Sequence, residues 1–183
     1  MPLAFESLSG GTAPPGDHRS PMIYSFGAGQ YWQAATVIYN RLQSQNITEG
    51  FLPFYFLCGQ SIELSLKGYL RAKGFTQAQL QDQKFLGHKL LDCLKEAQDR
   101  GFSFICPLTL EEFQLLILLD GYHKKHDFRF PEAGQKSYPK SELLLPLTKR
   151  FYEAAQTYCQ ANNKVHHGTP SAEIKQRIKP LVR

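Results

Sequence analysis

The segment from 53 to 73 carries small and apolar residues at steps of three and four. This spacing is typical of one helical face. It predicts a helix that starts near Pro53, where a first turn tolerates the missing amide, and ends at Gly74, a residue suited to a left-handed cap. Such a helix must bury its stripe against other elements. The stripe consists of Phe54, Leu57, Cys58, Ser61, Ile62, Ser65, Leu66, Tyr69 and Leu70.

Four other segments show the same period. They predict helices over about 29–45, 88–99, 109–122 or beyond, and 142–161. No segment longer than four residues alternates as a strand would. The sequence therefore predicts an all-α fold, an antiparallel up-and-down bundle of about five helices with short connections.

The chain divides by composition into three parts. Residues 1–26 are rich in Gly and Pro and predict a flexible leader, 27–169 form the bundle, and 170–183 form a basic tail. The longest apolar runs fall far short of the roughly 20 residues that cross a bilayer. The start of the sequence lacks the pattern of a secretory signal. We expect a cytoplasmic protein of one domain with no membrane partner.

The four cysteines lie far apart in the sequence. This spacing favours buried free thiols over a disulfide scaffold or a zinc ribbon.

The net charge of +5 is unevenly distributed. Residues 1–121 carry 9 basic and 11 acidic side chains, whereas residues 122–183 carry 12 basic and 5 acidic ones. A basic bias of this kind can mark contact with phosphates or an acidic partner, and it can equally be a solvated surface.

The densest titratable cluster of the sequence follows the fourth helix. His123 and His126 are three residues apart, and a metal ion would need a third ligand such as Asp127 or His88. No recognised zinc spacing is present, so we expect no metal and no cofactor. The alternative for this cluster is an exposed polar helix end, where the helix dipole favours cations. Its members are Tyr122, His123, Lys124, Lys125, His126, Asp127 and Arg129.

A second polar group lies on the helices themselves. Glu63 and Lys67 are one turn apart in the favourable acid-first order. This spacing predicts that Glu63 and Lys67 form a structural ion pair. The position of His88 predicts that its side chain makes a hydrogen bond at the start of a helix. If the second, third and fourth helices are neighbours, these residues converge with Tyr122 and Arg129 in one polar site.

Three short motifs resemble the HEPN superfamily. They are the segment 58–70 with its Glu and Lys, the segment 86–97 with Gly before His, and Tyr122 followed by Arg-Phe-Pro at 129–131. The resemblance covers about residues 30–160. It implies a four- or five-helix bundle, frequently a homodimer, that acts in toxin–antitoxin or defence systems. The partners it implies are RNA, a nucleotide or a nucleotidyltransferase-type protein.

Many active HEPN members are metal-independent ribonucleases that use an Arg followed by a His after four to six residues. No arginine of this chain has a His at that spacing. We therefore expect a binding domain with no catalytic residue assigned. The expected ligand-binding residues are Glu63, Lys67, His88, Tyr122, His123, Lys124, Lys125, His126 and Arg129.

Two alternatives remain open at this point. One is a ribonuclease with a re-sited active site, in which His123 or His126 carries the proton and Lys125 or Arg129 holds the phosphate. The other is a purely structural dimerisation module.

Overall fold

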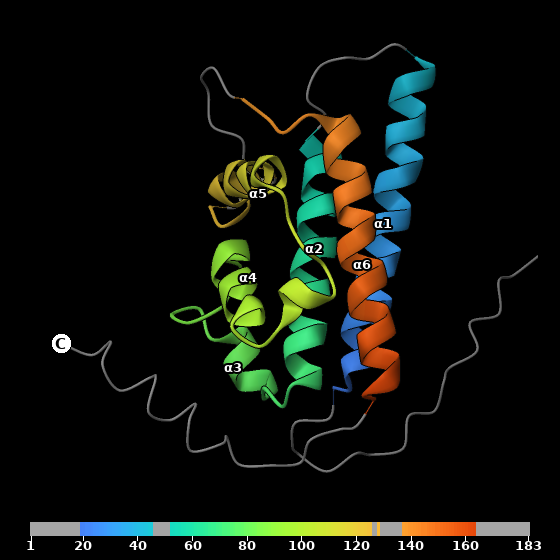
Figure 1. Cartoon of the computed structure of the whole chain (residues 1–183). Coiled ribbons are helices and arrows are strands. Elements are labelled where there is room, and N and C mark those ends of the chain that lie inside the picture. The colour runs from blue at the N-terminus through green and yellow to red at the C-terminus, as the bar shows by residue number, and fades with distance from the viewer. Residues whose placement is uncertain (1–18, 46–51, 126–127, 129–136, 164–183) are drawn as a thin grey trace, which may run out of the picture.

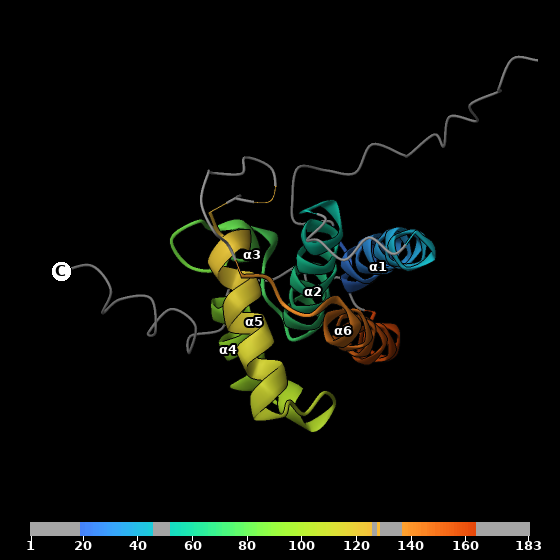
Figure 2. The ribbon, with the colours of Figure 1, turned by 90° about the horizontal axis from the view of Figure 1, so that it is seen from above.

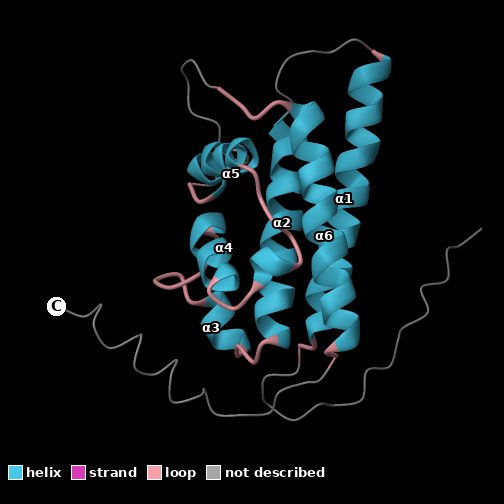
Figure 3. Cartoon of the chain, viewed as in Figure 1, coloured by secondary structure: helices cyan, strands magenta, loops and turns pink. Residues whose placement is uncertain are grey.

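The structure, a computed structural model, describes residues 19–45, 52–125, 128 and 137–163. These residues contain helices and no strand (Figure 3), so the prediction of an all-helical bundle is confirmed. The elements are α1 (Pro21–Ser44), α2 (Leu52–Ala72), α3 (Gln77–Gln81), α4 (Leu90–Gln98), the 3₁₀ helix η1 (Phe102–Phe104), α5 (Leu110–His123) and α6 (Ser141–Ala161).

Three long helices, α1, α2 and α6, lie side by side, and α1 runs opposite to the other two (Figure 1). The view from above shows that α5 runs across these three axes (Figure 2). The predicted antiparallel order therefore does not extend through the whole bundle. Because α5 lies crosswise, its C-terminal end reaches α2, where the polar site is found.

The second helix is the centre of the fold. It contacts α1, α3, α4, α5 and α6, and the side chains of its predicted stripe form much of the core. Phe54, Ile62 and Leu66 are almost fully buried. Burial stabilises the fold by about 1.5–3 kcal/mol for each such side chain. The outer helices each bury one face and keep the other toward solvent.

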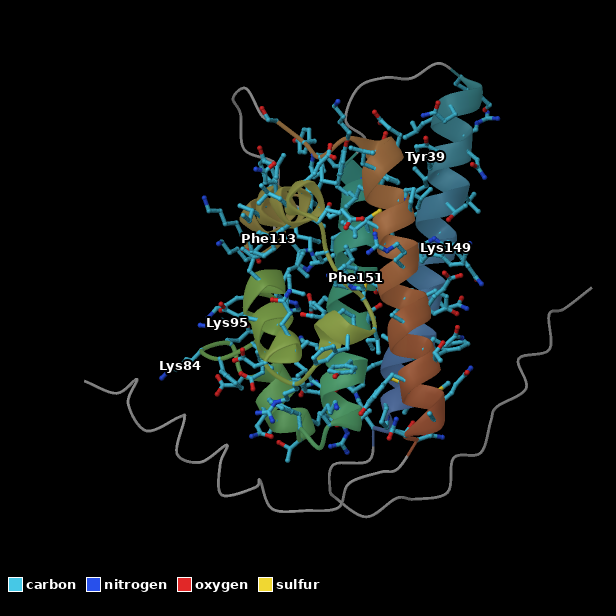
Figure 4. All side chains as sticks on the ribbon, in the orientation of Figure 1. Tyr39, Lys84, Lys95, Phe113, Lys149 and Phe151 are labelled. Carbon is cyan, nitrogen blue, oxygen red and sulfur yellow. The ribbon has the colours of Figure 1, made fainter. Side chains whose placement is uncertain are left out.

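Figure 4 illustrates this contrast. Phe151 of α6 lies inside the bundle, whereas Lys149 of the same helix is half exposed and Lys84 and Lys95 extend into solvent at the opposite edge.

Two boundaries differ from the sequence predictions. The first helix begins at Pro21, not near residue 29, so the last residues of the expected leader are helical. Pro21 occupies the first turn, where a proline costs no hydrogen bond. The helix α3 was missed; it begins at a capping box between Thr76 and Gln79 and is only five residues long. Residues 1–18 and the expected tail of 170–183 lie outside the described residues.

The four cysteines are free and buried, as the sequence predicts. Burial raises the pKa of both Cys58 and Cys93 to about 12, which keeps these thiols neutral. They act as small apolar side chains.

In the part of the chain that the structure describes, no helix combines the length and apolar character that spanning a bilayer requires.

Candidate functional site

The polar site is built around the carboxylate of Glu63, a residue of α2 that is only 2 % exposed. Its Oε1 accepts a hydrogen bond of 2.7 Å from Lys67 Nζ, one turn further along the helix. Its Oε2 lies 2.8 Å from His123 Nε2 and 3.1 Å from His88 Nδ1. One buried carboxylate thus gathers three basic side chains.

Each partner comes from a different part of the fold. Lys67 also lies on α2, His88 lies in the turn before α4, and His123 is the last residue of α5. Lys67 Nζ also donates to the carbonyl oxygen of Gly87, at 2.6 Å. The same ammonium group therefore holds the carboxylate and the turn that carries His88.

Two opposing effects set the charge of Glu63. Burial raises the pKa of its carboxyl group, but the hydrogen bonds from His123 and His88 and the positive charge of Lys67 more than offset this. The pKa is held well below its ordinary range. The group is therefore an anion that accepts hydrogen bonds at any physiological pH.

The absence of a side chain at Gly59 lets His123 lie directly against α2. A Cβ atom at Gly59 would lie 2.5 Å from His123 Nδ1. The imidazole therefore packs directly on the α2 backbone, one turn before Glu63. Gly68 allows the close approach of two other residues, because a Cβ atom there would meet Tyr24 of α1 and Cys159 of α6.

Asp120 fixes the start of α4 from the neighbouring helix. Its Oδ1 accepts hydrogen bonds from the backbone amides of Leu90 at 2.8 Å and Leu91 at 3.4 Å, and its Oδ2 accepts one from Lys124 at 3.0 Å. The residue at the usual capping position, Lys89, makes no such bond. An acid on α5 therefore caps α4, just after the turn that carries His88.

Replacing Asp120 with Ala should lower the free energy of unfolding by about 1–3 kcal/mol, because it leaves buried amides without their acceptor. Urea denaturation measures this. The matched control is Asp92→Ala in the first turn of α4, where the side chain is 53 % exposed and pairs with Lys89. This control should cost less than about 1 kcal/mol. Equal losses in the two variants would show that the cap contributes no more than a surface charge.

A pocket of about 320 Å³ opens beside this site. Its size lies at the lower end of the range that is usual for small-ligand sites. Glu63 and His88 both line it, and the His88 side chain is 39 % exposed. The other charged and amide side chains that line it are those of Arg19, Gln60, Lys67, Gln81 and Gln83.

The position of Arg19 is fixed by a buried arginine. Arg71 is fully buried, and its Nε donates to the carbonyl oxygen of Arg19 at 2.7 Å. Another of its nitrogens donates to the carbonyl oxygen of Phe75 at 2.6 Å. Arg71 thus ties the chain before α1 to the end of α2, and so places Arg19 beside the pocket.

A larger hollow of about 740 Å³ lies between the turn after η1 and α6. Its lining is mainly apolar, and its charged members are Arg150 and Glu153, on the outer part of α6. Arg150 already pairs with Glu112. We place the functional site in the smaller pocket because a buried carboxylate and several bases meet there.

The predicted polar residues fall into three groups. Glu63, Lys67, His88 and His123 meet in one site. His123 was expected among the ligand-binding residues, with an exposed helix end as the alternative, and it is buried. The helix α5 ends at His123. His126 and Arg129 lie outside the described residues.

The structure places the remaining predicted residues in other surroundings. Tyr122 packs against the rings of Phe128 and Tyr138, with centroids 5.7 and 5.2 Å away. Lys124 pairs with Asp120, and Lys125 is exposed.

Sequence reasoning did not single out Asp120, Arg19 and Arg71. For Asp120 a signal was present, since it follows Leu116 and Leu119 on the inner face of α5. An acid on an apolar face usually has a buried partner. For Arg19 the sequence offered no signal.

Comparison with protein-family models, with curated proteins and with solved structures finds no match to this chain.

Proposed function

We propose that this protein is a HEPN-like helical domain that binds a phosphate-bearing ligand, a nucleotide or RNA, in the pocket beside Glu63. The observation that carries the proposal is the joint placement of Arg19, Lys67 and His88 around one pocket. The three short motifs of the sequence point in the same direction.

The chemistry of the lining suits such a ligand. Arg19 is exposed and offers a planar guanidinium, which can bind a phosphate through two hydrogen bonds. The charges of Glu63 and Lys67 balance each other, so the cation of Arg19 is not cancelled within the pocket. The amides of Gln60, Gln81 and Gln83 supply donors and acceptors for a base edge or for sugar hydroxyl groups.

Among the described residues, the basic segment after residue 121 is a weaker candidate for phosphate binding. Five of its twelve basic side chains belong to the described residues. Three of these five, Lys124, Lys149 and Arg150, form ion pairs with acids. The proposal therefore rests on the pocket and not on the net charge of this segment.

RNA cleavage without a metal ion is a second candidate, and the position of His88 favours it. His88 is exposed to the pocket and is held by a carboxylate, as a general acid or base often is. His123 is 3 % exposed and is therefore a poor proton carrier for a bound RNA. A homodimer and a role in a toxin–antitoxin or defence system, with a nucleotidyltransferase-type partner, remain parts of the proposal.

Arg19→Ala should weaken nucleotide binding about tenfold or more, because a hydrogen bond to a charged group contributes about 1.5–3 kcal/mol. Fluorescence anisotropy with labelled nucleoside phosphates and a short RNA, at low and moderate salt, measures the affinity. Arg41→Ala is the matched control, since Arg41 is another exposed arginine but lies in the last turn of α1. It should leave the affinity unchanged.

Two results would decide against this proposal. The first is that the wild-type protein binds none of these probes at low salt. The second is that Arg41→Ala weakens binding as much as Arg19→Ala, which would indicate general charge attraction. Cleavage of the RNA in the presence of EDTA would favour the second candidate function.

A further inference from the structure

Three side chains from three parts of the fold bring one ligand atom each toward a common point. They are Glu63, His88 and His123, and their ligand atoms all lie within 4.8 Å of one another. We propose that this set binds a divalent transition-metal ion, with Zn²⁺ as the preferred ion. Two imidazoles and one carboxylate are a usual donor set for zinc and for related first-row metals.

Two of the three distances between the donor atoms suit such an ion. Glu63 Oε2 is 3.1 Å from His88 Nδ1 and 2.8 Å from His123 Nε2. Bonds of about 2.0–2.2 Å to a metal place neighbouring donor atoms about 2.9 Å apart in an octahedral site and about 3.4 Å apart in a tetrahedral one. The two distances from Glu63 Oε2 match the octahedral separation to within a few tenths of an ångström, whereas the two imidazole nitrogens lie within 4.8 Å of each other and would move closer together to bind one ion.

The two oxygens of Glu63 have different neighbours. Lys67 binds Oε1 at 2.7 Å and His123 Nε2 lies 2.8 Å from Oε2, while His88 Nδ1 lies 3.2 Å from Oε1 and 3.1 Å from Oε2. This leaves Oε2 as the metal ligand and makes Lys67 the outer partner that orients the carboxylate. Outer partners of this kind are common around zinc sites. Because Lys67 also binds the Gly87 carbonyl oxygen, it positions the turn that carries the second ligand, His88.

The site has a closed side and an open side. The side chains of Glu63 and His123 are 3 % and 2 % exposed, whereas that of His88 is 39 % exposed and faces the pocket of about 320 Å³. Three protein ligands beside an open position are typical of catalytic zinc sites, and structural sites are closed by a fourth. The open position here would take water or an anion. The positive charge of Lys67 favours an anion at this position, because the two charges are opposite in sign.

Cobalt substitution tests this inference without any nucleotide, so its outcome is separate from that of the proposed function. Titration of the full chain with Co²⁺ after EDTA treatment should produce visible absorption bands that saturate at one ion per chain. Zn²⁺ should displace the Co²⁺, and Mg²⁺ should not, because Mg²⁺ prefers oxygen ligands. His88→Ala should weaken the affinity for Co²⁺ by at least about tenfold, since even outer-shell changes cost about 10–100-fold.

The matched control removes the two adjacent histidines near the end of the chain. The double variant His166→Ala, His167→Ala should keep the bands and the affinity of the wild type. Loss of the bands in this variant, or unchanged affinity in His88→Ala, would overturn the proposed site.

A third measurement uses the unaltered protein and avoids any folding defect of a variant. Imidazole ¹⁵N spectra should show two histidines shifting on addition of Zn²⁺. Spectra that do not change would mean that hydrogen bonds alone hold the two rings to Glu63.

Discussion

Glu63→Gln should lower the free energy of unfolding by about 3–5 kcal/mol, the usual cost of removing one partner from a buried ion pair. The carboxylate accepts hydrogen bonds from Lys67, His88 and His123, and Lys67 is itself only 5 % exposed. The variant keeps the shape of the side chain and removes its charge. It therefore leaves a buried ammonium group without its counter-ion. Urea denaturation, with the slope of the transition checked for change, gives the difference.

The control for this variant is Glu153→Gln. Glu153 of α6 also pairs with a lysine, Lys149, four residues away, but the two side chains are 55 % and 50 % exposed. Pairs of this kind contribute about 0–1 kcal/mol. If Glu63→Gln were as mild as this control, the polar site would not hold α2, α5 and the turn before α4 together.

The same variant should change how stability depends on pH. The pKa of Glu63 in the folded protein lies below its ordinary value of 4.5. The unfolded chain therefore binds the proton more tightly, and the stabilisation by Glu63 is complete above about pH 4.5 and is lost as the pH falls. The Gln variant should lack this share of the acid destabilisation. About ten denaturation curves of each protein between pH 3 and pH 7 measure this. An equal loss of stability with falling pH in both proteins would contradict the prediction.

Gly59→Ala should have the second large effect, a loss of about 1–3 kcal/mol from overpacking. The new methyl group would lie 2.5 Å from His123 Nδ1 and 3.0 Å from its Cε1. The ring cannot give way freely, because Glu63 holds its other nitrogen. The variant should therefore move His123 away from the carboxylate as well. Chemical denaturation measures the first effect, and the imidazole ¹⁵N spectrum of His123 measures the second.

Gly121→Ala provides the matched comparison, because Gly121 also lies within a helix and a Cβ there would meet nothing within 4 Å. Removing a glycine from an open helical position should stabilise the protein by about 0.4–1 kcal/mol. The two substitutions are chemically identical. Opposite effects on the free energy of unfolding would therefore show that the close approach of α5 to α2 causes the loss in Gly59→Ala. A stabilising Gly59→Ala would contradict that contact.

The sequence predicted the long helices well, because their apolar period is sustained over many residues. The stripe of α2 is buried as expected, and the predicted Pro53 start and Gly74 stop lie close to the observed ends. The start of α1 was missed because the Gly and Pro content of residues 21–29 resembles that of a loop. The crosswise direction of α5 was also missed, since periodicity reports which face is buried and says nothing about the crossing angle.

The polar site was predicted in part. The structure brings Glu63, Lys67 and His88 together, which required only that α2 and the turn before α4 be neighbours. His123 was placed with its charged neighbours in the sequence, yet it is buried against Glu63. Whether a histidine at the end of a helix points inward depends on where that end lies in space. The pocket position of Arg19 likewise depends on a contact between Arg71 and a carbonyl 52 residues away.

The central position of α2 has a consequence for how this chain can diverge. A helix that contacts α1, α3, α4, α5 and α6 has no outer face along most of its length, so a change at almost any position meets a neighbour. The outer helices each keep a face toward solvent on which substitutions cost little. Among distant homologues of this protein, the sequence of α2 should therefore change most slowly. An alignment anchored on residues 54–72 should detect relatives that a whole-chain alignment misses.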